Sequence, residues 1–215
     1  MKLSLAGAAL LSLLVFYAFP AAAAAVGRVS EVEGTVTVAH GGSSAALKNG
    51  DGVSEGDVVE AAEKSRVRID FDDKTELVVV GKGKLTIDSY VYDPKNSAGN
   101  KAGFSILGAA FSYLGGALDK GKDPKVNLNL DFGSIGIRGT KIYRAMNNGE
   151  CWIYVERGKI DVSNRAGTVH LKSGQGTIMS AEDKAPANAH IWSDKDIAWL
   201  KAQVADPRLH KKDWK

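Results

Sequence analysis

The residues able to do chemistry are few and widely spaced along this chain of 215 residues. Asp72 and Asp73 are adjacent carboxylates on an expected turn, so we do not expect them to converge on a substrate as an acid/base pair. No nucleophile elbow and no His-Glu-x-x-His zinc motif occurs. The four histidines, none at the close spacing of a zinc site, are His40, His170, His190 and His210. The sequence therefore predicts no enzyme, no metal site and no cofactor.

Two glycine-rich segments suggest ligands only weakly. Residues 81–84 read Gly-Lys-Gly-Lys, but we expect them between two strands, without the helix N-terminus that would stabilise a bound phosphate. The Asp-Gly runs in residues 49–57 lack the spacing of an EF-hand, so plain turns are favoured over calcium binding. The formal net charge of +3 comes without a basic-aromatic platform, which argues against nucleic acid as a partner.

One arginine lies in an unusual glycine pattern at residues 133–140. Alternation places Ile135 and Ile137 on one face of a strand and Arg138 on the other. We predict that Gly139 bends the chain and that Arg138 makes a charge-assisted hydrogen bond to a carboxylate or to carbonyls at the bend. Binding of an anion or a partner by Arg138 is the alternative. The structural motif is Gly136, Ile137, Arg138, Gly139 and Thr140.

A candidate binding face comes from the strand expected over residues 85–92. Its alternation places Leu85 and Ile87 towards the interior and Asp88, Tyr90 and Tyr92 on the polar face. Aromatic rings beside a carboxylate can stack on a sugar and hydrogen-bond to it, so these three residues are a candidate carbohydrate or cell-wall site. Ordinary cross-strand packing of the tyrosines is the alternative.

Strands must position these residues, because period-two alternation recurs through most of the chain. We expect strands over 32–38, 66–71, 77–79, 85–92 and 125–130, with a polar loop over 92–103. Asn148-Gly149 is a strong hairpin signal. The predicted fold class is all-β: a β-solenoid-like roll or a sandwich of short antiparallel or coiled strands, with one C-terminal α-helix.

That helix is expected over Asp194–Ala205. Ser193 can cap it with Asp196 as the reciprocal partner, and Trp192 and Ile197 occupy the positions of a hydrophobic staple. We expect the helix to cover an open end or edge of the sheet, since exposed edges need protection. Docking of a partner on the helix is the alternative.

The first residues predict export. Lys2 precedes a long apolar run and small residues reach Ala25, which is typical of a secretory signal peptide over residues 1–25; an uncleaved membrane anchor is the alternative. No cysteine follows the run, so we expect a periplasmic or secreted protein without a lipid anchor. Residues 26–180 would form the β domain, and residues 181–215 a linker, the helix and a basic tail. The single cysteine, Cys151, excludes an internal disulfide and is expected to be a buried, inert thiol.

The chain resembles the FecR-like domain over residues 26–179. The resemblance lies in Gly34, the Gly-Asp pairs at 50–51 and 56–57, and the segments 88–94, 135–140, 155–162 and 174–176. It implies an extracytoplasmic all-β domain used for protein interaction in envelope signalling. Two turns depart from the family pattern, at Lys74 and at Leu130-Asp131.

The resemblance and the residues together favour an exported, non-enzymatic scaffold. Its partner would be another envelope protein, bound through the polar strand face or a sheet edge. A module that binds carbohydrate or cell wall is the runner-up. Signalling members of the family carry a cytoplasmic anti-sigma segment before a membrane span; we expect none here, since the signal peptide begins this sequence.

Overall fold

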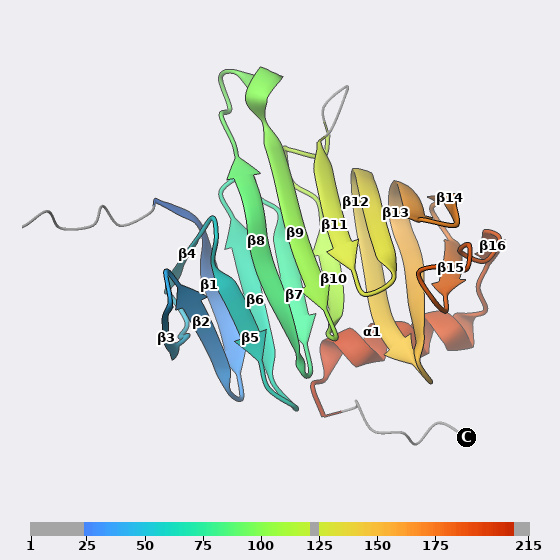
Figure 1. Cartoon of the computed structure of the whole chain (residues 1–215), viewed down its shortest axis with the longest axis horizontal. Coiled ribbons are helices and arrows are strands. Elements are labelled where there is room, and N and C mark those ends of the chain that lie inside the picture. Colours follow the sequence, from blue (N-terminus) through green and yellow to red (C-terminus); the bar gives the residue numbers. More distant parts are fainter. Residues whose placement is uncertain (1–23, 121–124, 209–215) are drawn as a thin grey trace, which may run out of the picture.

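The computed structural model describes residues 24–120 and 125–208, in which sixteen strands form one hydrogen-bonded sheet and one α-helix follows near the C-terminus (Figure 1). The sheet folds over on itself at two long strands, β12 (Gly133–Asn147) and β13 (Glu150–Asn164), and so forms two layers. The pairing of β9 with β11 is parallel, and the other pairings between described strands are antiparallel. The all-β fold with one C-terminal helix is as predicted.

We call the two layers the open layer and the helix layer. The open layer contains the first part of β12, the second part of β13, and β3 (Ser43–Ala46), β2 (Val36–His40), β5 (Val58–Ala61), β8 (Gly83–Val91), β9 (Lys101–Leu107), β11 (Val126–Leu130) and β14 (Gly167–Lys172). The helix layer contains the remaining parts of β12 and β13, and β4 (Gly52–Ser54), β1 (Ala25–Glu33), β6 (Arg66–Phe71), β7 (Glu76–Val80), β10 (Ala110–Leu114), β15 (Gln175–Met179) and β16 (His190–Ile191). A short 3-10 helix, η1 (Ser97–Gly99), lies in the loop before β9.

Two glycines let β12 and β13 pass from one layer to the other. Gly139 on β12 has φ +64° and Gly158 on β13 has φ +95°, both in the left-handed region that favours glycine. The register between the strands shifts between Arg138 and Lys141, which marks a β-bulge. The predicted bend at Gly139 is confirmed, and Gly158 faces it across the strand pair.

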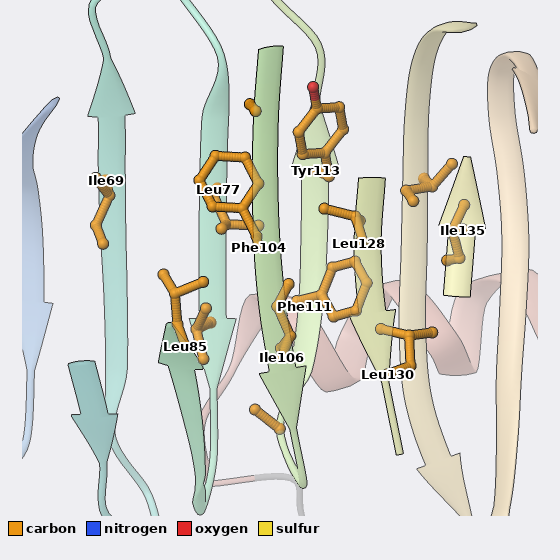
Figure 2. Packing of buried hydrophobic residues seen from close by; sticks show 14 of the residues in the cluster. Ile69, Leu77, Leu85, Phe104, Ile106, Phe111, Tyr113, Leu128, Leu130 and Ile135 are labelled. Carbon is orange, nitrogen blue, oxygen red and sulfur yellow. The ribbon is translucent and has the colours of Figure 1, made fainter. Parts of the chain in front are cut away.

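The main core lies between the two layers. Figure 2 shows side chains from both layers gathered there, including Ile69 and Phe111 from the helix layer and Leu85 and Phe104 from the open layer. The rings of Phe71 on β6 and Phe104 on β9 lie 5.0 Å apart between centroids, so the layers are in direct contact. Alternation in each strand supplies one buried face to this core, as the sequence predicts.

The helix α1 (Asp194–Ala205) begins and ends where the sequence predicts. The hydroxyl of Ser193 accepts a hydrogen bond from the backbone N–H of Asp196, so the predicted N-cap is confirmed. The Asp196 carboxylate accepts from the Ser193 hydroxyl rather than from the Ser193 backbone N–H, so the reciprocal bond differs from that of a capping box. Leu200 and Val204 pack with Val78, Ala145 and other residues in a second apolar cluster. The helix therefore covers a face of the helix layer, over β7, β10 and β12, rather than a sheet edge.

Packing explains a glycine in the segment 174–176, near the end of the β domain. A Cβ atom on Gly176 of β15 would overlap the indole ring of Trp192, which is buried just before the helix. We expect Gly176→Ala to lower the free energy of unfolding by about 2 kcal/mol, because the indole must move out of its place between sheet and helix. Urea unfolding of both proteins measures this. An unchanged midpoint would mean that the indole is free to move.

Several local predictions hold and others need correction. The Asn148-Gly149 turn joins β12 and β13, with φ +50° and +83° at its two residues, as expected of this hairpin. The prediction of one strand over 32–38 is wrong. β1 ends just before Gly34, which has φ +79°, and β2 then begins in the other layer. The strands β9 and β10 were not predicted from the sequence.

The predicted signal peptide and the predicted C-terminal segment lie at the two ends of the chain. The signal peptide over residues 1–25 lies almost wholly outside the described residues. β16 falls within the segment 181–215 and pairs with β15, so part of the expected linker adds to the sheet. No helix in the described part of the chain is long and apolar enough to cross a membrane.

Candidate functional site

Tyr90 does not lie on the polar face predicted for it. The register of β8 against β9 shifts between Ile87 and Ser89, so the alternation changes phase and Tyr90 points into the core. Its hydroxyl donates to Asp73 (2.9 Å) and accepts from the Asp73 backbone N–H (3.0 Å). Burial, together with the nearby carboxylate of Asp73, raises the pKa of Tyr90. Tyr90 is therefore a core residue that stacks on Phe71 of the other layer, with ring centroids 5.4 Å apart, and not a residue of the predicted binding face or of a cross-strand pair on it.

Asp88 and Tyr92 are also separated from each other. Asp88 is exposed and accepts a hydrogen bond from the Ser105 hydroxyl at 2.7 Å. Tyr92 is half-buried and packs against the main core. The three residues predicted to form one binding face therefore do not form it, and the sequence-based reason for a sugar site at this strand is lost.

The motif around Arg138 is placed at the crossing between layers. Ile135 and Ile137 are buried, whereas Arg138 is exposed, as alternation predicts. No ion pair or hydrogen bond joins the Arg138 side chain to another described residue, so its predicted anchoring role is wrong. The backbone N–H of Thr140 donates to the Asp119 carboxylate at 2.9 Å, and this contact holds the strand after the bend.

The buried arginine of this strand is Arg144, six residues further on. Its side chain is 0% exposed and donates to the Asp131 carboxylate, the Ala109 carbonyl oxygen and the Cys151 sulfur. A buried guanidinium needs this number of acceptors, because an unpaired buried charge is costly. Arg144 thus has the structural role that the sequence assigned to Arg138. Only tertiary contacts distinguish the two arginines.

Cys151 is buried, as predicted. Its sulfur lies 3.1 Å from the Arg144 Nε, which donates to it. Burial raises the pKa of the thiol, while the neighbouring guanidinium acts in the opposite direction with a smaller effect. A buried thiol with a raised pKa has little thiolate and little access to reagents, which is the character expected of an inert cysteine.

Asp72 and Asp73, adjacent in sequence, have different roles. Asp72 is exposed, whereas Asp73 is buried and accepts hydrogen bonds from Thr75, Tyr90 and the backbone N–H of Leu118. These bonds tie the loop after β10 to the turn after β6. The role of Asp73 is therefore structural: its hydrogen bonds stabilise the contact between these two segments. The sequence gives no sign of this, since its partners lie up to 45 residues away.

An open groove lies between α1 and the hairpin turn of β12 and β13. It has a volume of about 470 Å³ and is lined by Asn147, Asn148, Trp152, Lys195, Asp196, Ala198, Trp199 and Ala202. The indoles of Trp152 and Trp199 are half-buried and meet edge to face, with centroids 5.5 Å apart. The groove therefore has aromatic walls and a rim of charged and amide side chains. Sequence reasoning missed it because its two tryptophans are 47 positions apart.

A bridge of charges fixes the helix beside this groove. Glu156 on β13 pairs with Lys141 on β12 (2.8 Å) and with Lys201 on α1. Although partial burial acts in the opposite direction, hydrogen bonds from both lysines hold the pKa of Glu156 below its usual value. Both ammonium groups also lie over the ring of Tyr143, at 5.6 and 5.4 Å from its centroid. The helix side of the groove is thus held in a fixed position on the sheet.

Within residues 24–120 and 125–208, no group of three or more His, Cys, Asp or Glu side chains is arranged to hold a metal ion. The closest acidic contacts of histidine are His40 with Asp57 (2.5 Å) and His170 with Asp161 (2.6 Å). His40 on β2 and His170 on β14 lie towards opposite ends of the open layer. Among the described residues, the Trp152–Trp199 groove combines two indole rings with charged and amide side chains, and we take it as the candidate functional site.

Comparison with known proteins gives a likeness of fold alone. No protein-family model matches the sequence, and no curated protein matches it. Two crystal structures, at 1.65 and 2.50 Å resolution, of a "putative anti-sigma factor" from Parabacteroides distasonis ATCC 8503 are similar, each with a TM-score of 0.51 and 8% sequence identity. The likeness covers 66% of this chain and 63% and 62% of those chains, so the chain spans less than two thirds of either. In its fold, this protein is similar to a protein described as an anti-sigma factor.

Proposed function

We propose that this chain is an exported, non-enzymatic β-scaffold that binds another protein of the cell envelope and acts in envelope signalling. The predicted signal peptide and the resemblance to FecR-like domains support the location and the class of function. The similar fold of a protein described as an anti-sigma factor supports signalling at a coarse level. Regulation of a sigma factor by this chain itself is not part of the proposal.

The Trp152–Trp199 groove carries this proposal. Protein interfaces place aromatic side chains, tryptophan above all, in a central pocket and surround them with a polar rim. The groove has two indoles at its wall, with Lys195, Asp196 and Asn148 around it. The groove lies against α1, which the Glu156 bridge holds in place, so binding of a partner does not incur the entropic cost of ordering this helix.

A bulky residue at Ala198 tests the groove without disturbing the core. Ala198 is exposed and lines the groove, whereas Ala205 is exposed on the same helix but outside it. We expect Ala198→Arg to weaken capture of the envelope partner at least tenfold and Ala205→Arg to leave it unchanged, because only the first side chain occupies the groove. Affinity purification of the exported protein from envelope extracts, followed by titration of the recovered partner, measures this.

Two results would contradict the proposal. One is recovery of no stoichiometric protein from envelope extracts by the wild-type chain. The other is equal capture by the wild-type and Ala198→Arg proteins, which would move the interaction to another surface. Both arginine variants should unfold at the wild-type temperature, so a loss of binding cannot be ascribed to misfolding.

Carbohydrate binding is a second candidate, and the same groove supports it. Indole rings stack on sugars, and the amides of Asn147 and Asn148 can hydrogen-bond to hydroxyl groups beside them. A glycan array distinguishes the candidates: a glycan bound by the wild type and lost with Ala198→Arg, without any protein partner, would favour a sugar. This candidate replaces the site at Asp88, Tyr90 and Tyr92.

A further inference from the structure

A row of cations crosses the uncovered face of the open layer. Arg138 on β12 is the register partner of Lys159 on β13, and Lys159 is the partner of Lys172 on β14. All three are exposed, and they point away from the core on the same face. This face lies opposite the interior and is distinct from the groove beside α1.

Two further lysines extend the row. Val126 on β11 pairs with Ile137 on one side and with Ala102 on the other. The residues before Val126 and Ala102 are Lys125 and Lys101, so both continue the row beyond Arg138, and both are exposed. With neighbouring strands about 4.8 Å apart, the five positions span roughly 19 Å. We call Lys101, Lys125, Arg138, Lys159 and Lys172 the cation row.

The cation row has no acidic partner in the part of the chain that the structure describes. Among residues 24–120 and 125–208, no carboxylate lies within 4.0 Å of any of its charged groups, although ten other ion pairs of that length occur there. Like charges directly opposite each other in a sheet are destabilising. The arrangement is therefore unfavourable for the isolated fold and complementary to an external anion.

The shape of the positive region indicates a narrow ligand. A shallow pocket of about 540 Å³ lies along the row, lined by Arg138, Lys159 and Lys172 together with Asp161, His170 and Gln175. Asp161 and His170 form the neighbouring row and pair with each other at 2.6 Å. A broad anionic surface such as a membrane would bring negative groups over the Asp161 carboxylate. A single extended chain can follow the cations and avoid it.

The end of the row indicates a polypeptide. Lys172 lies on β14, which pairs only with β13 among the described strands and so forms an edge of the sheet (Figure 1). The backbone N–H of Lys172 already donates to the Gln175 side chain (3.0 Å), so the residues of β14 before Lys172 are the ones whose outward backbone groups can pair with the backbone of another polypeptide. A lipid headgroup or a polysaccharide cannot continue that ladder.

We infer that the cation row binds an acidic segment of a protein, which crosses the strands with its carboxylates over Lys101 to Lys172 and then turns to run along β14, where its backbone can pair. This surface extends the proposed function and does not depend on the groove. The guanidinium of Arg138 can hold one carboxylate through two parallel hydrogen bonds, and the lysines contribute longer-range attraction. Binding should therefore weaken as salt is added.

The test uses a fluorescent synthetic peptide with an unbroken run of glutamates that spans the row. Anisotropy titration of the whole exported chain should show saturable binding at low salt that weakens with added sodium chloride. Arg138→Glu combined with Lys159→Glu should reduce the affinity at least tenfold. The matched control, Lys48→Glu combined with Lys82→Glu, changes the net charge equally at exposed positions outside the row and should keep the wild-type affinity.

Four results would overturn the inference. They are no binding of the glutamate peptide at low salt, equal losses in the two double variants, binding of vesicles rich in anionic lipid in place of the peptide, and stronger binding of a polyuronate of equal charge. Capture of the envelope partner by both double variants, together with loss by Ala198→Arg, would leave the proposed function intact and remove only this surface.

Discussion

Replacing Gly158 with alanine is expected to lower the free energy of unfolding by about 3 kcal/mol. Gly158 has φ +95°, and a Cβ atom there would overlap the carbonyl group of Gly139 on the opposite strand. The left-handed conformation alone costs alanine about 1 kcal/mol, and the overlap adds a comparable or larger amount because both groups are backbone. The two long strands can then no longer cross between the layers at their present separation.

Gly149 is the matched control for this change. It has φ +83° at the tip of the same hairpin, and a Cβ atom there would meet nothing within 4 Å. Gly149→Ala should therefore cost only the conformational part, about 1 kcal/mol. Urea denaturation followed by tryptophan fluorescence measures both values. Equal losses would mean that the close approach at the crossing contributes nothing to stability.

The second large effect is expected at Arg144. Replacing it with methionine keeps most of the side-chain volume but removes the donor to the Ala109 carbonyl, and it leaves the Asp131 carboxylate with the backbone N–H of Gly108 as its remaining described partner. Breaking a buried charge pair on one side costs about 3–5 kcal/mol. We expect about 3 kcal/mol, because Asp131 keeps 27% of its side-chain surface exposed and water can hydrate part of its charge.

Arg138→Met is the control, since it removes the same group from the same strand. Arg138 is exposed and has no partner among the described residues, so its replacement should change the free energy of unfolding by less than about 0.5 kcal/mol. Similar losses at the two positions would restore a structural role to Arg138. A stable Arg144→Met protein would mean that the buried contacts of Arg144 balance its desolvation.

Features set by neighbours in sequence could be read directly from the chain. The Asn148-Gly149 turn, the Ser193 cap and the faces of Ile135, Ile137 and Arg138 follow from local geometry and from alternation. These interactions form within a few residues, so the sequence contains all of their determinants.

The candidate site was predicted less well, because a single irregularity changes the phase of a strand. The bulge between Ile87 and Ser89 turns Tyr90 into the core and so removes the predicted binding face. Alternation gives no sign of where an extra residue enters a strand. That position depends on the partner strand β9, which the sequence did not reveal.

By itself, the sequence determined that this is an all-β chain with a capped C-terminal helix, a bend at Gly139 and a tight hairpin, because turn chemistry and period-two alternation act locally. Only the tertiary structure decided which arginine is buried, that Tyr90 points into the core, and which side chains meet in the Trp152–Trp199 groove and the cation row. Those outcomes depend on strand register and on the folding of one sheet into two layers. Both join residues far apart in the chain, and no local pattern encodes such pairings.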